Sequence, residues 1–248
     1  MIRRILLALA AAVLFAAPAF AQSFVIRNVR IFDGDRIIDA NSVAVADGKI
    51  VAVGKDIASA PNAQVIDGTG DTLMPGLIDS HVHAWIRDVL KMDLVMGVTT
   101  DLDMYMWSQN IAPWRKQEAE GAPDVADFRT AGTAIAVAGG HGTVEPNLPK
   151  LVPIEGSEQA QAFVDERIAQ GSDYIKVLFD NGPRFAAMSK ETLAAIVKAA
   201  HARHKMVIVH VLSAQGFLDV IDAGADGLAH VPIVKMPEPQ FRDALRTH

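Results

Sequence analysis

Apolar and polar residues alternate from residue 24 to about residue 72, in short runs separated by turn residues. The run "FVIRNVRIFDGDRII" breaks at Asp33-Gly34, and "SVAVADGKIVAVG" alternates on both sides of Asp47-Gly48. Alternation with a period of two predicts strands, and an Asp-Gly pair between two such runs predicts a hairpin. The pattern therefore predicts a small N-terminal β module over residues 22–74.

After residue 74, short apolar runs alternate with segments of helical periodicity. The predicted strands cover residues 77–79, 97–103, 125–131, 173–179, 205–210 and 226–230. The predicted helices cover residues 86–96, 107–120, 157–170, 189–204 and 214–223. A loop rich in glycine and proline is predicted over residues 132–156. Strands that alternate with helices are typical of βα units around a parallel sheet.

The number of βα units predicts the fold class, α/β with an incomplete barrel. A (β/α)8 TIM-type barrel needs eight units and typically about 250 residues. Residues 75–248 provide about six units, and the last segment, "PEPQFRDALRTH", has no helix stop signal such as a C-cap glycine. We therefore expect a C-terminally truncated barrel, with a six-stranded open α/β domain as the alternative.

The N-terminus predicts a secretory signal peptide over residues 1–21. A short basic start, Met1 to Arg4, precedes the uncharged apolar run from Ile5 to Ala17, and Ala19-Phe20-Ala21 has the small-x-small form of a cleavage site. The apolar run is short for a membrane span. We expect cleavage after Ala21 and a bacterial periplasmic or secreted protein with no membrane association after cleavage.

Composition narrows the chemistry and the partners. The chain has no cysteine, which restricts any metal site to histidine, carboxylate and other nitrogen or oxygen ligands. The net charge of −6 and the absence of a dense basic patch argue against nucleic-acid binding. The expected partner is a small-molecule substrate, and a homo-oligomer is left open.

Four histidines follow or end predicted barrel strands. His81 and His83 close the first strand in "LMPGLIDSHVHAW", and residues two apart on a strand point to the same face. His210 ends "MVIVH" and His230 ends "GLAH". Sites in parallel barrels are built at the C-terminal ends of the strands. The pattern predicts a metal site that includes these four imidazoles.

A lysine lies inside an apolar strand of the same barrel. Lys176 occupies the middle of "DYIKVLF", where a buried cation is costly, so the amine is expected to be neutral or paired. A neutral amine can react with carbon dioxide to form a carbamate. That group is an anionic oxygen ligand that can bridge two cations, so Lys176 joins the predicted ligand set.

These motifs carry a resemblance to a known family. "MPGLIDSHVH", "DYIKV", "VIVH" and "GADGLAHV" resemble the first-, fourth-, fifth- and sixth-strand motifs of the amidohydrolase superfamily. The β module of residues 22–74 resembles the N-terminal β-sandwich segment of that superfamily, so the resemblance covers nearly all of residues 24–235. "GSDYIKVL" and the "GGHG" loop are similar to the branch that contains imidazolonepropionase-like and prolidase-like dipeptidases.

The resemblance implies a site with two divalent metal ions, most often zinc. His81 and His83 would hold the more buried metal, and His210 and His230 would hold the second. Lys176, carboxylated by carbon dioxide, would bridge both. The implied activity is hydrolysis of a carbon–nitrogen bond in a cyclic amide, another non-peptide amide or a dipeptide, through a metal-activated hydroxide.

Two further residue roles follow from the resemblance. His141 in "AGGHG" would bind a carboxylate or carbonyl oxygen of the substrate, although a solvated loop histidine is the alternative. The family's proton-shuttling aspartate follows strand eight, and no residue of this sequence matches it, since Asp101, Asp103 and Asp180 lie elsewhere. No catalytic residue is therefore assigned, and the chain as given is expected to have little or no activity.

Two alternatives to the metal-dependent hydrolase remain open. One is a secreted, non-catalytic barrel that binds a metal or another ligand, which the unmatched aspartate motivates. The other is a mononuclear deaminase acting on a ring amidine, which would use the same scaffold. Lys176 argues against the deaminase, because that chemistry usually needs no bridging lysine.

Overall fold

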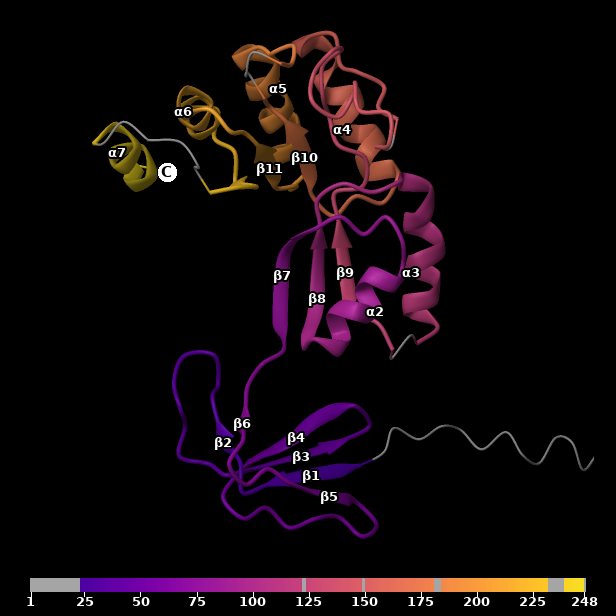
Figure 1. Cartoon of the computed structure of the whole chain (residues 1–248), viewed down its shortest axis with the longest axis vertical. Helices are drawn as coiled ribbons and strands as arrows, with labels where there is room; N and C mark the ends of the chain where they lie inside the picture. The colour runs from indigo at the N-terminus through magenta and orange to yellow at the C-terminus, as the bar shows by residue number, and fades with distance from the viewer. Residues whose placement is uncertain (1–22, 122–123, 149, 181–183, 232–238, 248) are drawn as a thin grey trace, which may run out of the picture. The chain divides into compact units, whose positions relative to one another are not determined.

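The computed structural model describes residues 23–121, 124–148, 150–180, 184–231 and 239–247 (Figure 1). The predicted signal peptide lies outside the described residues. The chain forms two compact units, one that ends at Pro75 and one that begins at Gly76. The boundary predicted between residues 74 and 75 lies one residue from this division. Among the described residues, no helix has both the length and the apolar character needed to cross a membrane.

The first unit consists of strands. A four-stranded sheet has the order β4-β3-β1-β5, and β2 pairs with β6. Its strands are β1 Phe24–Arg27, β2 Arg30–Ile31, β3 Ser42–Ala46, β4 Lys49–Gly54, β5 Gln64–Asp67 and β6 Thr72–Leu73. Asp47 and Gly48 form the predicted turn with positive φ angles of 50° and 71°, the backbone that a two-residue hairpin loop requires. Val29, Ile31 and Val43 form the buried core of this unit.

The second unit alternates strands and helices as the sequence predicts. Its strands are β7 Leu77–Val82, β8 Val98–Asp103, β9 Asp127–Thr130, β10 Ile175–Leu178, β11 Val207–His210 and β12 Gly227–Leu228. Its α-helices are α2 Asp88–Val95, α3 Ile111–Ala119, α4 Ala160–Ala169, α5 Lys190–His201, α6 Ala214–Asp222 and α7 Gln240–Thr247, with short 3-10 turns at Ser108–Asn110 and Ser157–Gln159. Ser189 caps α5, because its side chain accepts a hydrogen bond from the Thr192 amide.

The six strands of the second unit follow one another in chain order. They form two parallel three-stranded sheets, β7-β8-β9 and β10-β11-β12. The segment that follows β9 reaches β10 at Ile135, whose amide donates to the Lys176 carbonyl at 2.8 Å and whose carbonyl accepts from the Leu178 amide at 2.9 Å. The arrangement confirms the predicted partial barrel of six βα units. The described part of residues 132–156 contains no helix or strand, as the sequence predicts, but Ile135 and Val137 form isolated bridges to Val177 and Ile154.

Strand β10 is the most deeply buried strand of this unit. All four of its residues are buried, and Ile175 and Val177 belong to a core cluster with residues of α4 and α5, which lie beside β10 and β11 in Figure 1. Because side chains alternate along a strand, Lys176 points away from that helical layer. The Tyr174 hydroxyl, on the same face as Lys176, donates to the Asp103 carbonyl oxygen at 2.7 Å.

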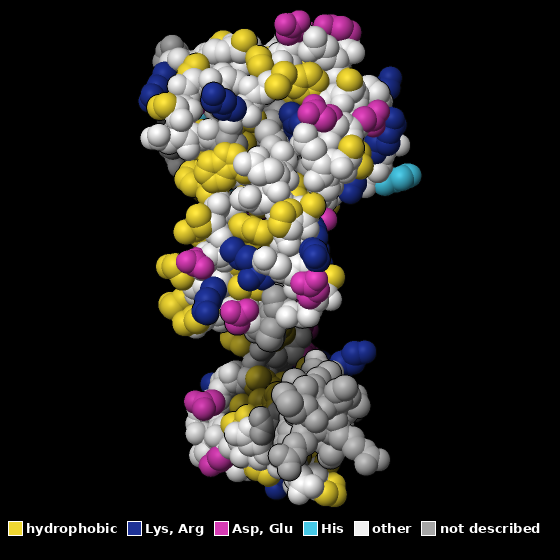
Figure 2. Space-filling view, turned by 90° about the vertical axis from the view of Figure 1, so that its right-hand side faces the viewer, with side chains coloured by type: hydrophobic (Ala, Val, Ile, Leu, Met, Phe, Trp, Pro, Cys, Tyr) yellow, Lys and Arg dark blue, Asp and Glu magenta, His cyan; other side chains and the backbone are white. Residues whose placement is uncertain are grey.

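Strand β7 differs from its prediction as a buried strand. Leu77 and Ile78 are 50% and 64% exposed, because β7 has a strand neighbour on one side only, β8, among the described residues. Further apolar side chains reach solvent on α2, where Met92 and Val95 are exposed. Figure 2 shows apolar side chains interspersed with charged groups of both signs on one face of the molecule.

Candidate metal centre

A pocket of about 280 Å³ in the second unit collects every residue that the sequence predicts for the site. Its lining contains the five predicted metal ligands and His141. These six side chains come from segments up to 149 positions apart in the chain. The C-terminal ends of β7 and β11 place His81, His83 and His210, and Lys176 lies within β10. The pocket is completed by Trp85, Tyr105, Leu148 and Leu178.

Main-chain carbonyls orient the two histidines of β7. His81 Nδ1 lies 2.7 Å from the Ala229 carbonyl oxygen, and His83 Nδ1 lies 3.2 Å from the Tyr105 carbonyl oxygen. A carbonyl can only accept, so each Nδ1 must carry the hydrogen, which leaves the lone pair of the neutral ring on Nε2. Desolvation in the pocket lowers the pKa of both imidazoles. Both rings are therefore prepared as neutral ligands.

His210 and His230 form the second imidazole pair. His210 Nδ1 lies 2.7 Å from His230 Nε2, and the His230 ring stacks on His81 with centroids 4.7 Å apart. Burial lowers the pKa of His210 to about 3 and that of His230 to about 4, and neighbouring histidines and Lys176 add to the effect. These rings are neutral at pH 7, as a metal ligand must be.

Lys176 lies inside the pocket on the buried strand β10. The residue is 2% exposed, and burial lowers the pKa of its amine to about 8, while the nearby Asp103 carboxylate opposes that shift. A lowered pKa increases the fraction of neutral amine at neutral pH. The neutral amine is the form that can react with carbon dioxide.

Asp103 supports the pocket from β8 without lining it. Its buried carboxylate accepts from the Ala84 amide at 2.9 Å and from the Thr130 hydroxyl at 2.5 Å. Burial raises the pKa of this carboxyl to about 6, against the lowering effect of the two hydrogen bonds. The contacts tie the segment after His83 to the end of β9.

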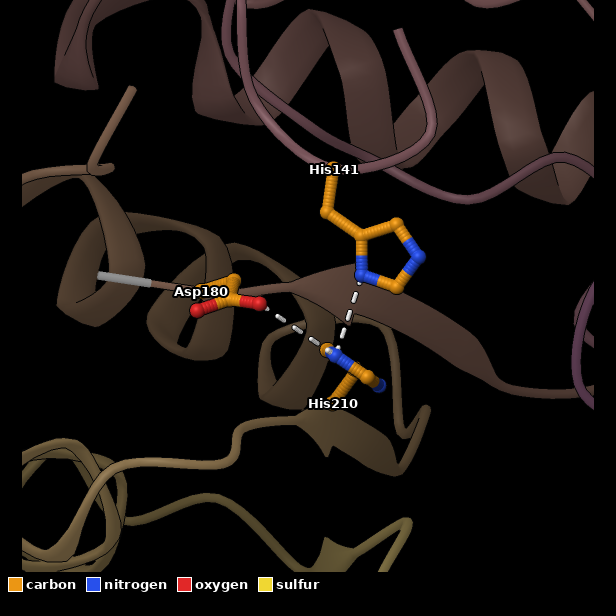
Figure 3. Close-up of side chains that lie close together, drawn as sticks. All are labelled: His141, Asp180 and His210. Carbon is orange, nitrogen blue, oxygen red and sulfur yellow. Dashed lines mark hydrogen bonds and ion pairs between the residues drawn. The ribbon is translucent and has the colours of Figure 1, made fainter. Parts of the chain in front are cut away.

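A further carboxylate lies next to His210. Asp180 Oδ2 is 3.9 Å from His210 Nε2, and His141 Nδ1 is 3.0 Å from the same nitrogen (Figure 3). His141, Asp180 and His210 each offer a donor atom, and these three atoms lie within 4.8 Å of one another. Asp180 does not match the family's strand-eight aspartate, and the sequence assigns it no role in the site. Asp180 follows Lys176 by four residues, which is two periods of a strand. This spacing indicates that both side chains point to the same face.

All six predicted site residues lie where a common site requires them. The structure brings His81, His83, Lys176, His210 and His230 to one pocket, as a shared ligand set requires. His141 also lines this pocket, but it contacts His210 and stacks on Phe185 with ring centroids 5.2 Å apart. A set of neutral imidazoles with a desolvated amine suits a divalent metal of the zinc type. The individual ligand roles stay predictions.

The family assignment follows from a comparison of the sequence with known protein families. The model of the amidohydrolase family matches residues 72–245, which include the whole pocket. The chain belongs to the amidohydrolase family. Members of this family are metal-dependent, in agreement with the grouping of donor atoms from His141, Asp180 and His210.

Individual amidohydrolases resemble parts of this chain. It is 30% identical to enamidase from Eubacterium barkeri over 165 residues, which cover 57% of this chain and 42% of the enamidase. It is 36% identical to 5-methylthioadenosine/S-adenosylhomocysteine deaminase from Pyrococcus furiosus over 95 residues, 38% of this chain and 21% of the deaminase. A prolidase crystallised with N-methylphosphonate-L-proline shares the fold, with a TM-score of 0.71 and 23% identity over 84% of this chain and 60% of the prolidase. The chain thus spans less than two thirds of each relative.

Proposed function

We propose that the protein is a metal-dependent hydrolase that acts on the carbon–nitrogen bond of a cyclic amide, another non-peptide amide or a dipeptide. The observation that carries the proposal is the convergence of four neutral imidazoles and the desolvated Lys176 on one pocket. Family membership supports it, as do relatives named enamidase and prolidase. The prolidase likeness favours the dipeptidase branch.

The metal ligands divide into two pairs in this proposal. His81 and His83 would hold one ion through Nε2, and His210 and His230 would hold the second through Nδ1 and Nε2. Lys176, as a carbamate, would bridge the two ions. When bound, two divalent ions, zinc by the nature of the donors, would supply activation of water and polarisation of the substrate carbonyl.

The remaining pocket residues would bind and position the substrate. Leu148 and Leu178 line the pocket with apolar surface that excludes water and fits an apolar part of a small substrate. His141 would donate a hydrogen bond to a carboxylate or carbonyl oxygen of that substrate. The Ala229 and Tyr105 carbonyls keep the β7 imidazoles in place during the reaction.

A deaminase is the second candidate, because two relatives of this chain carry that name. The buried Lys176 favours the hydrolase, since its amine faces the same pocket as the four histidines. The two candidates differ in product. Hydrolysis of an amide releases a carboxylate, whereas deamination of a ring amidine releases ammonia.

The experiment is a metal and substrate screen on the protein expressed from its complete reading frame. Bound zinc is measured together with hydrolysis of hydantoins, dihydropyrimidines and Xaa-Pro dipeptides and with ammonia release from aminopurines. We expect two equivalents of metal and carboxylate formation that a chelator abolishes. Less than one equivalent of metal, with activity indifferent to the chelator, would refute the proposal.

We also propose that the protein is exported to the bacterial periplasm. The proposal rests on the basic start, apolar run and small-residue cleavage site of residues 1–21. Cell fractionation and N-terminal sequencing test it. The expected mature N-terminus is Gln22, and a cytoplasmic protein that retains Met1 would contradict export.

A further inference from the structure

His210 offers its two ring nitrogens to two different groups of side chains. Nδ1 lies 2.7 Å from His230 Nε2, on the side of the four-histidine pocket. Nε2 lies 3.0 Å from His141 Nδ1 and 3.9 Å from Asp180 Oδ2 (Figure 3). A neutral imidazole has one lone pair available for a metal, on either nitrogen but not on both. His210 can therefore act as a ligand on one side at a time.

The Nε2 side of His210 has the geometry of a small cation site. Metal–ligand distances of about 2.0 to 2.2 Å separate the donors of a tetrahedral zinc site by roughly 3.3 Å. The measured separations of 3.0 Å and 3.9 Å bracket that value, and the three donor atoms lie within 4.8 Å of one another. Only small side-chain movements are needed to place one ion among them.

The chemistry of the three donors is also selective. Two imidazole nitrogens and one carboxylate oxygen suit zinc-type divalent ions better than calcium or magnesium, which prefer oxygen ligands. Asp180 and His210 are buried, and stacking on Phe185 restrains the ring of His141. The Asp180 carboxylate supplies the negative charge that an ion in a buried position requires.

We propose that His141, Asp180 and His210 form a separate binding position for a zinc-type divalent ion. An ion there uses Nε2 of His210, so the ring hydrogen resides on Nδ1. That tautomer withdraws His210 from the ligand set shared with His230. The two positions therefore compete for one imidazole, and excess metal displaces His210 from the pocket it shares with His230.

The experiment isolates the new position by removing the other ligands. The background is the 248-residue chain with His81→Asn, His83→Asn and His230→Asn, freed of metal with a chelator. Co²⁺ is titrated into it and followed by visible absorption and equilibrium dialysis. We expect about one equivalent bound, and X-ray absorption is expected to show two histidines at the ion.

Substitutions of the trio then test which side chains hold that equivalent. Asp180→Asn and His141→Asn in the same background should each lower the Co²⁺ affinity at least about tenfold. The matched controls are Asp222→Asn and His204→Asn, exposed residues that should leave the affinity unchanged. Circular dichroism and thermal unfolding establish that each variant is folded.

The outcomes separate this inference from the proposed hydrolase function. The inference fails if the background binds no Co²⁺, or if Asp180→Asn and His141→Asn bind it as the background does. Either result leaves the hydrolase proposal standing, provided that the unsubstituted protein binds metal. If the unsubstituted protein binds only the single equivalent found in the background, and Asp180→Asn removes that equivalent from both, the hydrolase proposal alone would be overturned.

Discussion

The two halves of the pocket hold their histidines by different means. On the β7 side, His81 and His83 each donate to a main-chain carbonyl. On the β10–β11 side, the ring nitrogens of His210 lie beside the side chains of His141, His230 and Asp180, with no main-chain partner among the described residues. Main-chain carbonyls fix one tautomer, whereas imidazoles can exchange donor and acceptor roles. The first half is preorganised, and the second half can rearrange around an ion.

The largest effect is expected from the preorganised half. Replacement of both His81 and His83 by Asn should remove one metal ion and lower kcat/KM by roughly 1,000-fold, equivalent to about 4 kcal/mol of transition-state stabilisation. His141→Asn in the other half should lower it by only about tenfold. Metal analysis and steady-state kinetics on the best substrate of the screen measure both. Equal losses of kcat/KM in the two variants would contradict the view that only the β7 half is preorganised.

Lys176 lies between the halves, and its replacement tests whether they share a bridging ligand. Lys176→Met should fold, because it replaces a buried amine with an apolar side chain of similar length. We expect loss of one of two metal ions and a decrease in activity of about 100-fold, which added formate or propionate partly restores. Lys198→Met, an exposed change on α5, is the control. Full metal content in Lys176→Met would show that no bridge is needed.

The sheet that carries the first half also contains a carboxyl group that resists ionisation. Both oxygens of Asp101 on β8 are buried without a hydrogen-bond partner among the described residues. Burial raises the pKa of this carboxyl to about 7, and the Asp93 and Asp79 carboxylates add to the effect. The folded protein retains a proton that the unfolded chain releases above about pH 4. The free energy of unfolding should therefore fall as the pH rises from about 4 to 7.

Asp101→Asn should remove this pH dependence. At pH 7.5 we expect the free energy of unfolding to increase by about 2 kcal/mol. This gain is smaller than the raised pKa of Asp101 implies, because the new amide also lacks hydrogen-bond partners. Urea denaturation at pH 4.5, 6 and 7.5 measures the change, with the exposed Asp124→Asn as control. Hydrogen exchange should locate the gain in β7–β9 rather than β10–β12. An unchanged pH slope would disprove the assignment to Asp101.

The smallest effect is expected at the Tyr105 carbonyl, which orients His83. That oxygen accepts from His83 Nδ1 at 3.2 Å and from Trp85 Nε1 at 3.0 Å. Trp85→Phe removes one donor and leaves the other, so metal affinity should change by less than about threefold and unfolding free energy by less than about 1 kcal/mol. Isothermal titration and thermal unfolding measure these quantities. A larger loss of metal affinity would mean that Trp85 itself holds the His83 ring.

The sequence predicts the strands of the barrel well where local pattern and tertiary setting agree. "DYIKVLF" and "KMVIVH" are short β-branched runs, and both are buried strands. The pairing of Ile135 with Val177 could not be predicted, because "TAIAV" is short, lacks strand propensity at its alanines and follows a glycine. The exposure of Leu77 depends on which strands flank β7, a property that no local pattern encodes.

The sequence predicts those site residues that lie at the ends of strands. His81, His83 and His210 follow from strand position, since the C-terminal edge of parallel strands gathers them. His141 was predicted from its loop, but its contact with His210 requires the path of that loop in space. Asp180 does not match the family's strand-eight aspartate, so the sequence assigns it no role, and only the folded chain shows it beside His210.

The bond between His81 and the Ala229 carbonyl has a consequence for synthesis. The two residues are 148 positions apart, so His81 leaves the ribosome long before its partner exists. At about 5 to 20 residues per second, the delay is roughly 7 to 30 s. During this interval the His81 imidazole has no carbonyl to fix its tautomer. Metal capture in the correct geometry is therefore a late event, after the sixth strand has been made.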